Sequence, residues 1–322
     1  MDKKTNLLIT GGAGFIGSNL VEHFLEDDRI GFIRVLDNLS NGYKENIEEF
    51  LDHPRFEFIQ GDIRDYETCL KACEGINKIS HQAALGSVPR SIENPMLSSE
   101  VNILGTVNIM YAAVKQEVDR VILAFSSSTY GDHPDLPKVE ENIGNPLSPY
   151  AVTKASIEQF ADVFGKTYGL NWIGLRYFNV FGPKQNPSNP YAAVIPLFCS
   201  RSLKNQVLQV YGNGETSRDF TYVSNAVQAN DLGLFIENEE ALNQIYNIGC
   251  GRQITLLNVI SELEEILTKR IGIHHSIERK GDVKHSLADI KKAQTLLGYN
   301  PHLDFKESLE QTLKWIGSSI KK

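Results

Sequence analysis

Short apolar runs alternate with helical patterns through the first half of the chain. Helical patterns begin near Gly14, Lys44, Tyr66, Pro95 and Pro149. Asn-Pro at 94–95 and Ser-Pro at 148–149 are typical helix starts, because the first residue caps and proline fits the first turn. Strands separated by helices predict a parallel sheet covered on both faces. The predicted strands are 7–10, 32–36, 56–60, 78–81, 121–125 and 172–175.

The pattern changes after residue 178. A loop-rich segment with several prolines comes first, followed by short strands at 208–211 and 245–248. We therefore predict one unit over 1–178 and a smaller mixed α/β unit over 179–322. Segments within about 211–249, namely 219–223 and 245–248, are predicted to return to the first sheet, so that the two units interleave. The predicted later helices are 256–268, 286–297 and 305–317.

A glycine-rich turn, Gly-Gly-Ala-Gly-Phe-Ile-Gly at 11–17, joins the first predicted strand to the first helix. Glycines let a tight turn lie against a diphosphate, and the helix N-terminus offers unpaired N–H groups to it. Asp37, at the tip of the second strand, can accept bonds from ribose hydroxyls and would repel a 2′-phosphate. This context predicts a Rossmann-type, doubly wound sheet that binds NAD rather than NADP. The alternative is a glycine turn that binds nothing.

Composition restricts the classes of partner. The 322 residues allow one large or two moderate domains, and the net charge of −8 argues against a surface that coats nucleic acid. The four cysteines show no metal-type spacing and suit a reducing compartment. The N-terminal apolar stretch is too short for a signal peptide, and no window could span a bilayer. We expect a cytoplasmic protein without a metal, a nucleic-acid partner or a membrane partner.

Tyr150 and Lys154 form the candidate catalytic pair. Their spacing places both on one face of a helix, where an ammonium would lower the pKa of a phenol and make it a general base. Such a pair alone is often surface decoration. Here it follows the fifth predicted strand, which runs into the hydroxyl-rich segment 126–130, and parallel sheets carry their chemistry at strand ends. The alternative for that segment is a serine-rich loop that caps a helix.

These features, together with several longer motifs, resemble the extended short-chain dehydrogenases/reductases. Within that superfamily the chain is similar over essentially its full length to nucleotide-sugar epimerases, in particular the UDP-N-acetylglucosamine 4-epimerase group. The longer motifs lie at 81–91, 131–134, 175–182, 191–196, 214–220 and 281–286.

The resemblance implies a role for each matching position. Ser126 would relay a proton, Tyr150 would be the base, and Lys154 would be its electrostatic partner. The cofactor NAD would contact Gly11, Gly14, Phe15, Ile16, Gly17, Asp37, Asn38, Asp62, Ile63, Ala84, Tyr150, Lys154 and Tyr177. The UDP-sugar would contact Gly86, Ser87, Ser127, Ser128, Asn179, Ala193, Val194, Tyr211, Arg218, Arg279, Asp282 and Ser286.

The resemblance also separates the possible reactions. Related 4,6-dehydratases carry an Asp-Glu pair, and related decarboxylases a Glu, where this chain has Ser127 and Ser128. Without a carboxylate there, no extra acid or base serves C5 and C6 of the sugar. We expect C4 epimerisation through a transient 4-keto sugar. A dehydratase and a non-catalytic NAD-binding module are the weaker alternatives.

Substrate choice in this family depends on one wall of the site. Galactose-restricted epimerases place a large tyrosine where this chain has Ser286, and Gly86 also suits a spacious site. We therefore expect UDP-GlcNAc and UDP-GalNAc as substrates, which would connect the enzyme to polysaccharide synthesis by association. The uronic acids UDP-GlcNAcA and UDP-GlcA remain alternatives.

Members of this family commonly form homodimers through a four-helix bundle. The candidate helices here are 95–116 and 149–168. The first carries apolar residues at helical spacing, namely Ile103, Val107, Met110 and Val114. The alternative is that this apolar face packs only inside its own subunit.

Overall fold

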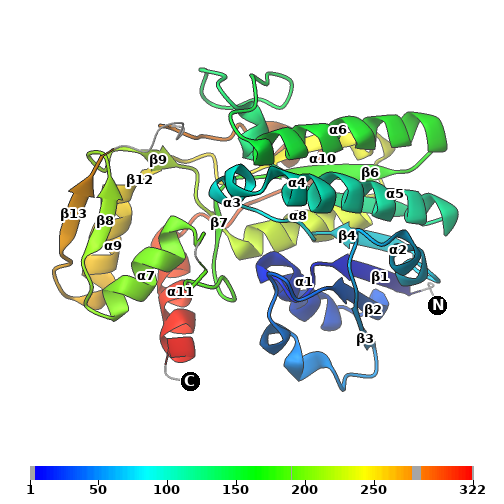
Figure 1. Ribbon diagram of the computed structural model, residues 1–322, viewed down its shortest axis with the longest axis horizontal. Helices are drawn as coiled ribbons and strands as arrows, with labels where there is room; N and C mark the ends of the chain where they lie inside the picture. Colours follow the sequence, from blue (N-terminus) through cyan, green and yellow to red (C-terminus); the bar gives the residue numbers. More distant parts are fainter. Residues whose placement is uncertain (1–3, 190, 278–283, 321–322) are drawn as a thin grey trace.

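A seven-stranded parallel sheet organises the computed structural model, which describes residues 4–189, 191–277 and 284–320 (Figure 1). The strand order is β11-β6-β5-β4-β1-β2-β3. Because β1 pairs with both β2 and β4, the order reverses beside β1, and open α/β sheets bind ligands at such a point. The strands are β1 (Thr5–Thr10), β2 (Ile30–Asp37), β3 (Phe56–Gln60), β4 (Lys78–His81), β5 (Arg120–Ser126), β6 (Trp172–Tyr177) and β11 (Gln244–Ile248).

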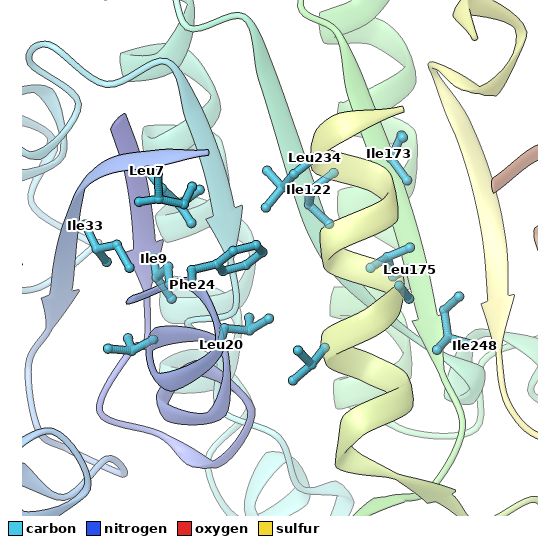
Figure 2. Close-up of a cluster of buried hydrophobic side chains, with 14 of the residues drawn as sticks. Leu7, Ile9, Leu20, Phe24, Ile33, Ile122, Ile173, Leu175, Leu234 and Ile248 are labelled. Atoms are coloured by element: carbon cyan, nitrogen blue, oxygen red, sulfur yellow. The ribbon is translucent and has the colours of Figure 1, made fainter. Parts of the chain in front are cut away.

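Helices cover both faces of this sheet, as the sequence predicted. Along β1, Leu7 and Ile9 enter one hydrophobic cluster and Leu8 enters the other, since successive strand residues point to opposite faces. Figure 2 shows Phe24 of α1 beside β1, and Leu234 of α8 beside β5 and β6. The first face carries α1 (Phe15–Leu25), α8 (Val223–Phe235) and α10 (Lys291–Leu297), and the second carries α2 (Tyr66–Ala72), α5 (Gly105–Lys115) and α6 (Pro149–Tyr168).

A second group of elements packs around a third hydrophobic cluster, on the left of Figure 1. Phe198, Leu208, Leu263 and Leu309 are among its fully buried members. Three small sheets contribute: β7 (Val180–Phe181) with β10 (Thr221–Tyr222), β8 (Leu208–Tyr211) with β13 (Ile273–Ser276), and β9 (Ser217–Arg218) with β12 (Ile254–Thr255). The helices are α7 (Val194–Leu203), α9 (Leu256–Leu267) and α11 (Phe305–Ile320).

Three predicted elements differ in the structure. The helix expected near Lys44 is a pair of short 3₁₀ turns, because Tyr43 N and Asn46 Nδ2 donate to Ala13 O and hold the segment against the glycine turn. The predicted strand 219–223 contributes β10, which pairs with β7 and not with the large sheet, whereas 245–248 does join that sheet as β11. Residues 286–289 are irregular instead of helical, because the amides of Ser286, Ala288 and Asp289 bond to other segments.

Other elements were not predicted. They include α3 (Val88–Glu93), α7 and α8, and a π-helical turn over Glu100–Leu104 that interrupts the predicted helix 95–116 between α4 (Pro95–Ser99) and α5. None of the helices within the described ranges has the length and apolar character needed to cross a membrane.

Candidate active site

One cleft of about 1450 Å³ collects nearly all of the predicted site residues. It lies at the carboxyl ends of the large sheet and extends to β8, β9 and α7. Asp62 does not line the cleft, and Arg279 and Asp282 lie outside the described residues. The predicted residues that line it are Gly11, Gly14, Phe15, Ile16, Gly17, Asp37, Asn38, Ile63, Ala84, Gly86, Ser87, Ser126, Ser127, Ser128, Tyr150, Lys154, Tyr177, Asn179, Ala193, Val194, Tyr211, Arg218 and Ser286.

The glycine turn has the shape that a diphosphate requires. Gly11 has φ +68°, and a Cβ there would lie 2.8 Å from the backbone of Ala83. A Cβ on Gly17 would lie 2.2 Å from Gly11 O, so neither position accepts a side chain. Gly14 caps α1 without a side-chain hydrogen bond, which leaves the first amides of the helix facing the cleft. The turn therefore fits a diphosphate bound by backbone N–H groups.

Asp37 is fixed at the end of β2 beside this turn. Its Oδ2 accepts from Ala13 N at 3.0 Å and its Oδ1 from Leu39 N at 2.8 Å. Burial raises the pKa of the carboxyl, and these two backbone hydrogen bonds oppose the rise. Each oxygen can accept a second bond, so an ionised Asp37 can still bind a pair of hydroxyls. Asn38, the next residue, donates to Asp62 at 2.8 Å, so Asp62 orients a residue that lines the cleft.

The candidate catalytic pair lies on the first turns of α6. Ser148 caps the helix by accepting from Ala151 N at 3.1 Å, and Tyr150 N donates to Ser91 Oγ at 3.0 Å. Lys154 Nζ donates to Ala124 O on β5 at 2.7 Å and lies 6.0 Å from the centre of the Tyr150 ring. Both side chains reach the cleft where the chain leaves β5.

The electrostatics of this pair differ from the sequence-based expectation. Burial raises the pKa of the Tyr150 hydroxyl, opposed by a hydrogen bond with the side chain of Ser126. Burial lowers the pKa of Lys154 to about 8, opposed by the charge of Glu158. The net pKa of Tyr150 is therefore raised and not lowered as expected, because desolvation of the half-buried phenol outweighs the hydrogen bond that favours its ionised form.

The serine segment after β5 presents several hydroxyls to the cleft. Ser126 Oγ accepts from Ser128 N at 3.2 Å, which orients it at the start of the turn Ser127–Tyr130. Ser128 Oγ is buried without a hydrogen-bond partner among the described residues. Since buried polar groups are normally satisfied, this hydroxyl is available to a ligand in the cleft.

The segment that carries Ser286 runs between β9 and the loop before α6. Ser286 N donates to Ser217 O at 3.2 Å, and Lys138 N donates to Leu287 O at 2.7 Å. Arg218 Nη1 donates to Lys284 O at 3.2 Å, so this guanidinium both supports the segment and lines the cleft. The two sides of the cleft are thus joined by backbone hydrogen bonds.

Sequence reasoning missed the partners of several site residues. The Tyr177 hydroxyl accepts from Asn230 Nδ2 of α8 at 2.7 Å and donates to Gln82 Oε1 at 3.3 Å. Arg176 forms a buried ion pair with Glu158. An arginine within the apolar run 172–177 was a usable signal for a buried pair, whereas no local pattern points from Tyr177 to Asn230.

A family model described as GDP-mannose 4,6 dehydratase matches residues 8–312. A putative UDP-glucose 4-epimerase of Methanocaldococcus jannaschii is 36% identical over 316 residues, which cover 96% of this chain and 98% of that protein.

Two solved structures have a fold similar to that of this chain. A UDP-N-acetylglucosamine 4-epimerase from Methanobrevibacter ruminantium M1, in complex with UDP-N-acetylmuramic acid, has a TM-score of 0.93 and 37% identity, covering 99% of this chain and 100% of that chain. A UDP-glucuronic acid 4-epimerase from Bacillus cereus, in complex with UDP-glucuronic acid and NAD, has a TM-score of 0.91 and 30% identity, covering 98% and 99%.

Proposed function

The chain belongs to the extended short-chain dehydrogenases/reductases, in the family described as GDP-mannose 4,6-dehydratase, and on this premise we propose that it interconverts UDP-GlcNAc and UDP-GalNAc. The broader activity is that of a UDP-sugar 4-epimerase with NAD as its cofactor. That the sugar is an N-acetylhexosamine is a separate, more specific proposal, because the chain is also similar to epimerases named for UDP-glucose and UDP-glucuronic acid.

The convergence of Tyr150, Ser126 and Lys154 in one cleft with the glycine turn carries this proposal. A hydroxyl-to-carbonyl oxidation needs a proton acceptor beside a dinucleotide site, and this arrangement supplies one. Dehydration would need a further acid or base, and the adjoining positions are Ser127 and Ser128. The proposed reaction is therefore epimerisation, despite the description of the family model.

The glycine turn and Asp37 would hold the dinucleotide by its diphosphate and ribose. When bound, NAD supplies the hydride acceptor and donor for the sugar C4. Tyr150 takes the proton of the 4-hydroxyl and later returns it, and its hydrogen-bonded partner Ser126 holds the phenol in place. Lys154, when protonated, stabilises the phenolate that proton transfer creates.

Epimerisation also requires the sugar to present both faces of C4 to the same reacting groups. We assign the anchoring of the nucleotide to Asn179, Ala193, Val194 and Arg218, which also line the cleft. Firm binding there would leave the sugar free to turn about its link to the diphosphate while the serines contact it in either orientation.

Two positions support an N-acetylated sugar. Ser286 brings a small hydroxyl to the wall of the cleft, where it can bond an amide. A Cβ on Gly86 would meet nothing within 4 Å, so the site is open there.

We also propose a homodimer through the outer face of α6. Val152, Phe160 and Val163 are each more than a third exposed and lie along one side of this helix. On the neighbouring helix, Met110 is fully buried and Val107 packs against the same internal cluster, which favours the alternative that this face packs inside its own subunit. Ile103 and Val114 are partly buried as well.

The test is to incubate the purified protein with UDP-GlcNAc, without added cofactor, and to identify products by NMR. UDP-GalNAc is the expected product, and its formation would also show that NAD co-purifies. The Tyr150→Phe variant should lose about 10²–10⁴-fold in kcat while it retains NAD, because only the proton-transferring hydroxyl is removed. No product from UDP-GlcNAc, UDP-glucose, UDP-GlcA or UDP-GlcNAcA, with NAD supplied, would contradict the assignment as an enzyme.

A further inference from the structure

A buried ion pair joins the catalytic helix to the sheet. Arg176 Nε on β6 donates to Glu158 Oε1 at 2.8 Å, and its Nη2 donates to Oε2 at 2.7 Å. The two side chains are only 2% and 7% exposed. Arg176 Nη1 also donates to Glu140 O at 2.8 Å. A buried pair of this kind often stabilises a fold no better than apolar residues would, so its presence here calls for another reason.

The position of Glu158 supplies that reason. It lies one helical turn after Lys154, on the same side of α6. Lys154 is 4% exposed, and its ammonium donates a hydrogen bond to Ala124 O. A buried ammonium loses its proton readily unless a negative charge lies close to it. Glu158 is the described group whose charge acts on Lys154 in that direction.

The other titratable groups around Lys154 are neutral or already paired. His81 on β4 has its pKa lowered to about 3 by burial and by Lys154, and it bonds to Thr10 and Thr106 through its two ring nitrogens. Burial raises the pKa of Tyr177 on β6 to about 12. Burial likewise raises the pKa of Tyr150 on α6.

We propose that Glu158, clamped by Arg176, is a positioning residue that holds the Lys154 turn of α6 against the sheet and keeps the Lys154 ammonium charged for the reaction. This rests on the proposed function, in which that ammonium stabilises the Tyr150 phenolate. Arg176 fixes the carboxylate through two hydrogen bonds, so that Glu158 stays in place.

The proposal has a consequence for pH dependence. The pKa of Lys154 is lowered to about 8, so its positive charge is present below this pH and is lost as pH rises through it. In Glu158→Gln the anion is gone and the Arg176 cation is left without its partner. Both changes disfavour a second buried cation, so the alkaline limit of kcat should move down by about one pH unit or more.

The experiment measures kcat against pH for the holoenzyme with saturating UDP-GlcNAc. Asp162→Asn is the matched control, because it removes the same charge from the same helix at an exposed site that pairs with Lys166. Solvent screens that site, so its pH profile should match the wild type. Arg176→Lys retains a charge pair with Glu158 and should lower thermal stability with the alkaline limit unchanged.

If Glu158→Gln does not fold, a double variant, Glu158→Gln with Arg176→Met, tests the same proposal. It removes both buried charges, so its alkaline limit should lie between those of Glu158→Gln and the wild type. An unshifted limit in either folded Glu158 variant, with kcat lowered equally at every pH, would show a purely structural pair and overturn the inference. Absence of wild-type turnover would instead overturn the proposed function.

Discussion

Single residues in the cleft owe their positions mainly to backbone contacts. Ser286 reaches the wall of the cleft because its own amide bonds to Ser217 O, and Tyr150 is held at the start of α6 through Ser91. Substitutions of these side chains should therefore change chemistry or specificity more than folding.

Substitution of Ser286 tests which sugar the site selects. Replacing it with Tyr should fill the space proposed for the N-acetyl group, lowering kcat/KM for UDP-GlcNAc by about 100-fold or more while UDP-glucose is spared. Steady-state kinetics with both substrates would measure this. Ser286→Ala keeps the site small and should retain both activities. An equal loss of both substrates in Ser286→Tyr would contradict a role in selecting the sugar.

Among single residues, the sequence was sufficient to predict those whose arrangement depends only on neighbours in the chain. The glycine turn is set within residues 11–17, and Tyr150 and Lys154 are neighbours on one helix. The Glu158–Arg176 pair depends on how α6 lies against β6, and the Tyr177–Asn230 bond depends on the placement of α8. Such pairings need the tertiary structure, because no spacing rule connects residues on separate elements.

Among the elements, α6 has two functional faces. Ile157, Ala161 and Phe164 are buried against the sheet, while Phe160 and Val163 remain exposed. The exposed positions make the helix suitable for an interface that lies directly outside the catalytic residues.

The proposed interface can be tested with Phe160→Glu. A charge at the centre of an apolar contact should weaken dimerisation by about 30-fold or more, measured as the dissociation constant by sedimentation. Gln294→Glu, which adds the same charge at an exposed site on α10, should leave association unchanged. A wild-type protein that sediments as a monomer, or a Phe160→Glu protein that dimerises normally, would exclude this face.

Prediction of elements succeeded where apolar periodicity was strong. The buried strands β1 to β6 each contain an apolar run that marks them in the sequence. The prediction of a helix was wrong for residues 286–289, because this segment bonds to Ser217 and Lys138. It was wrong near Lys44 because Ala13 O accepts hydrogen bonds from that segment. In both places long-range hydrogen bonds override local helical pattern.

In the molecule as a whole, Asp219 connects the large sheet to the segment that carries Ser286. Its fully buried carboxylate accepts from Cys250 N at 2.7 Å, Gly251 N at 3.0 Å and Ala288 N at 3.1 Å. The turn after β11 and the substrate segment are thus held by one side chain.

Asp219→Asn should therefore affect both stability and substrate binding. An asparagine side chain has one acceptor oxygen where the carboxylate has two, so it cannot accept all three backbone hydrogen bonds. The free energy of unfolding should therefore fall by about 2–4 kcal/mol. Urea denaturation would measure this, and KM for the UDP-sugar should rise while NAD retention is preserved. Asp135→Asn, at an exposed site, is the control. An unchanged unfolding midpoint would contradict this role.

The strand β11 has a consequence for how the protein is made. A nascent chain that has reached residue 178 contains β1 to β6, but neither β11 at the sheet edge nor α8 and α10 over one face. Ile122 and Ile173 would face water, and β6 would be an open edge ready to pair with other chains. The nucleotide-binding half cannot be completed early in translation. It needs shielding until residues near 297 have left the ribosome, and a product truncated after 178 should aggregate.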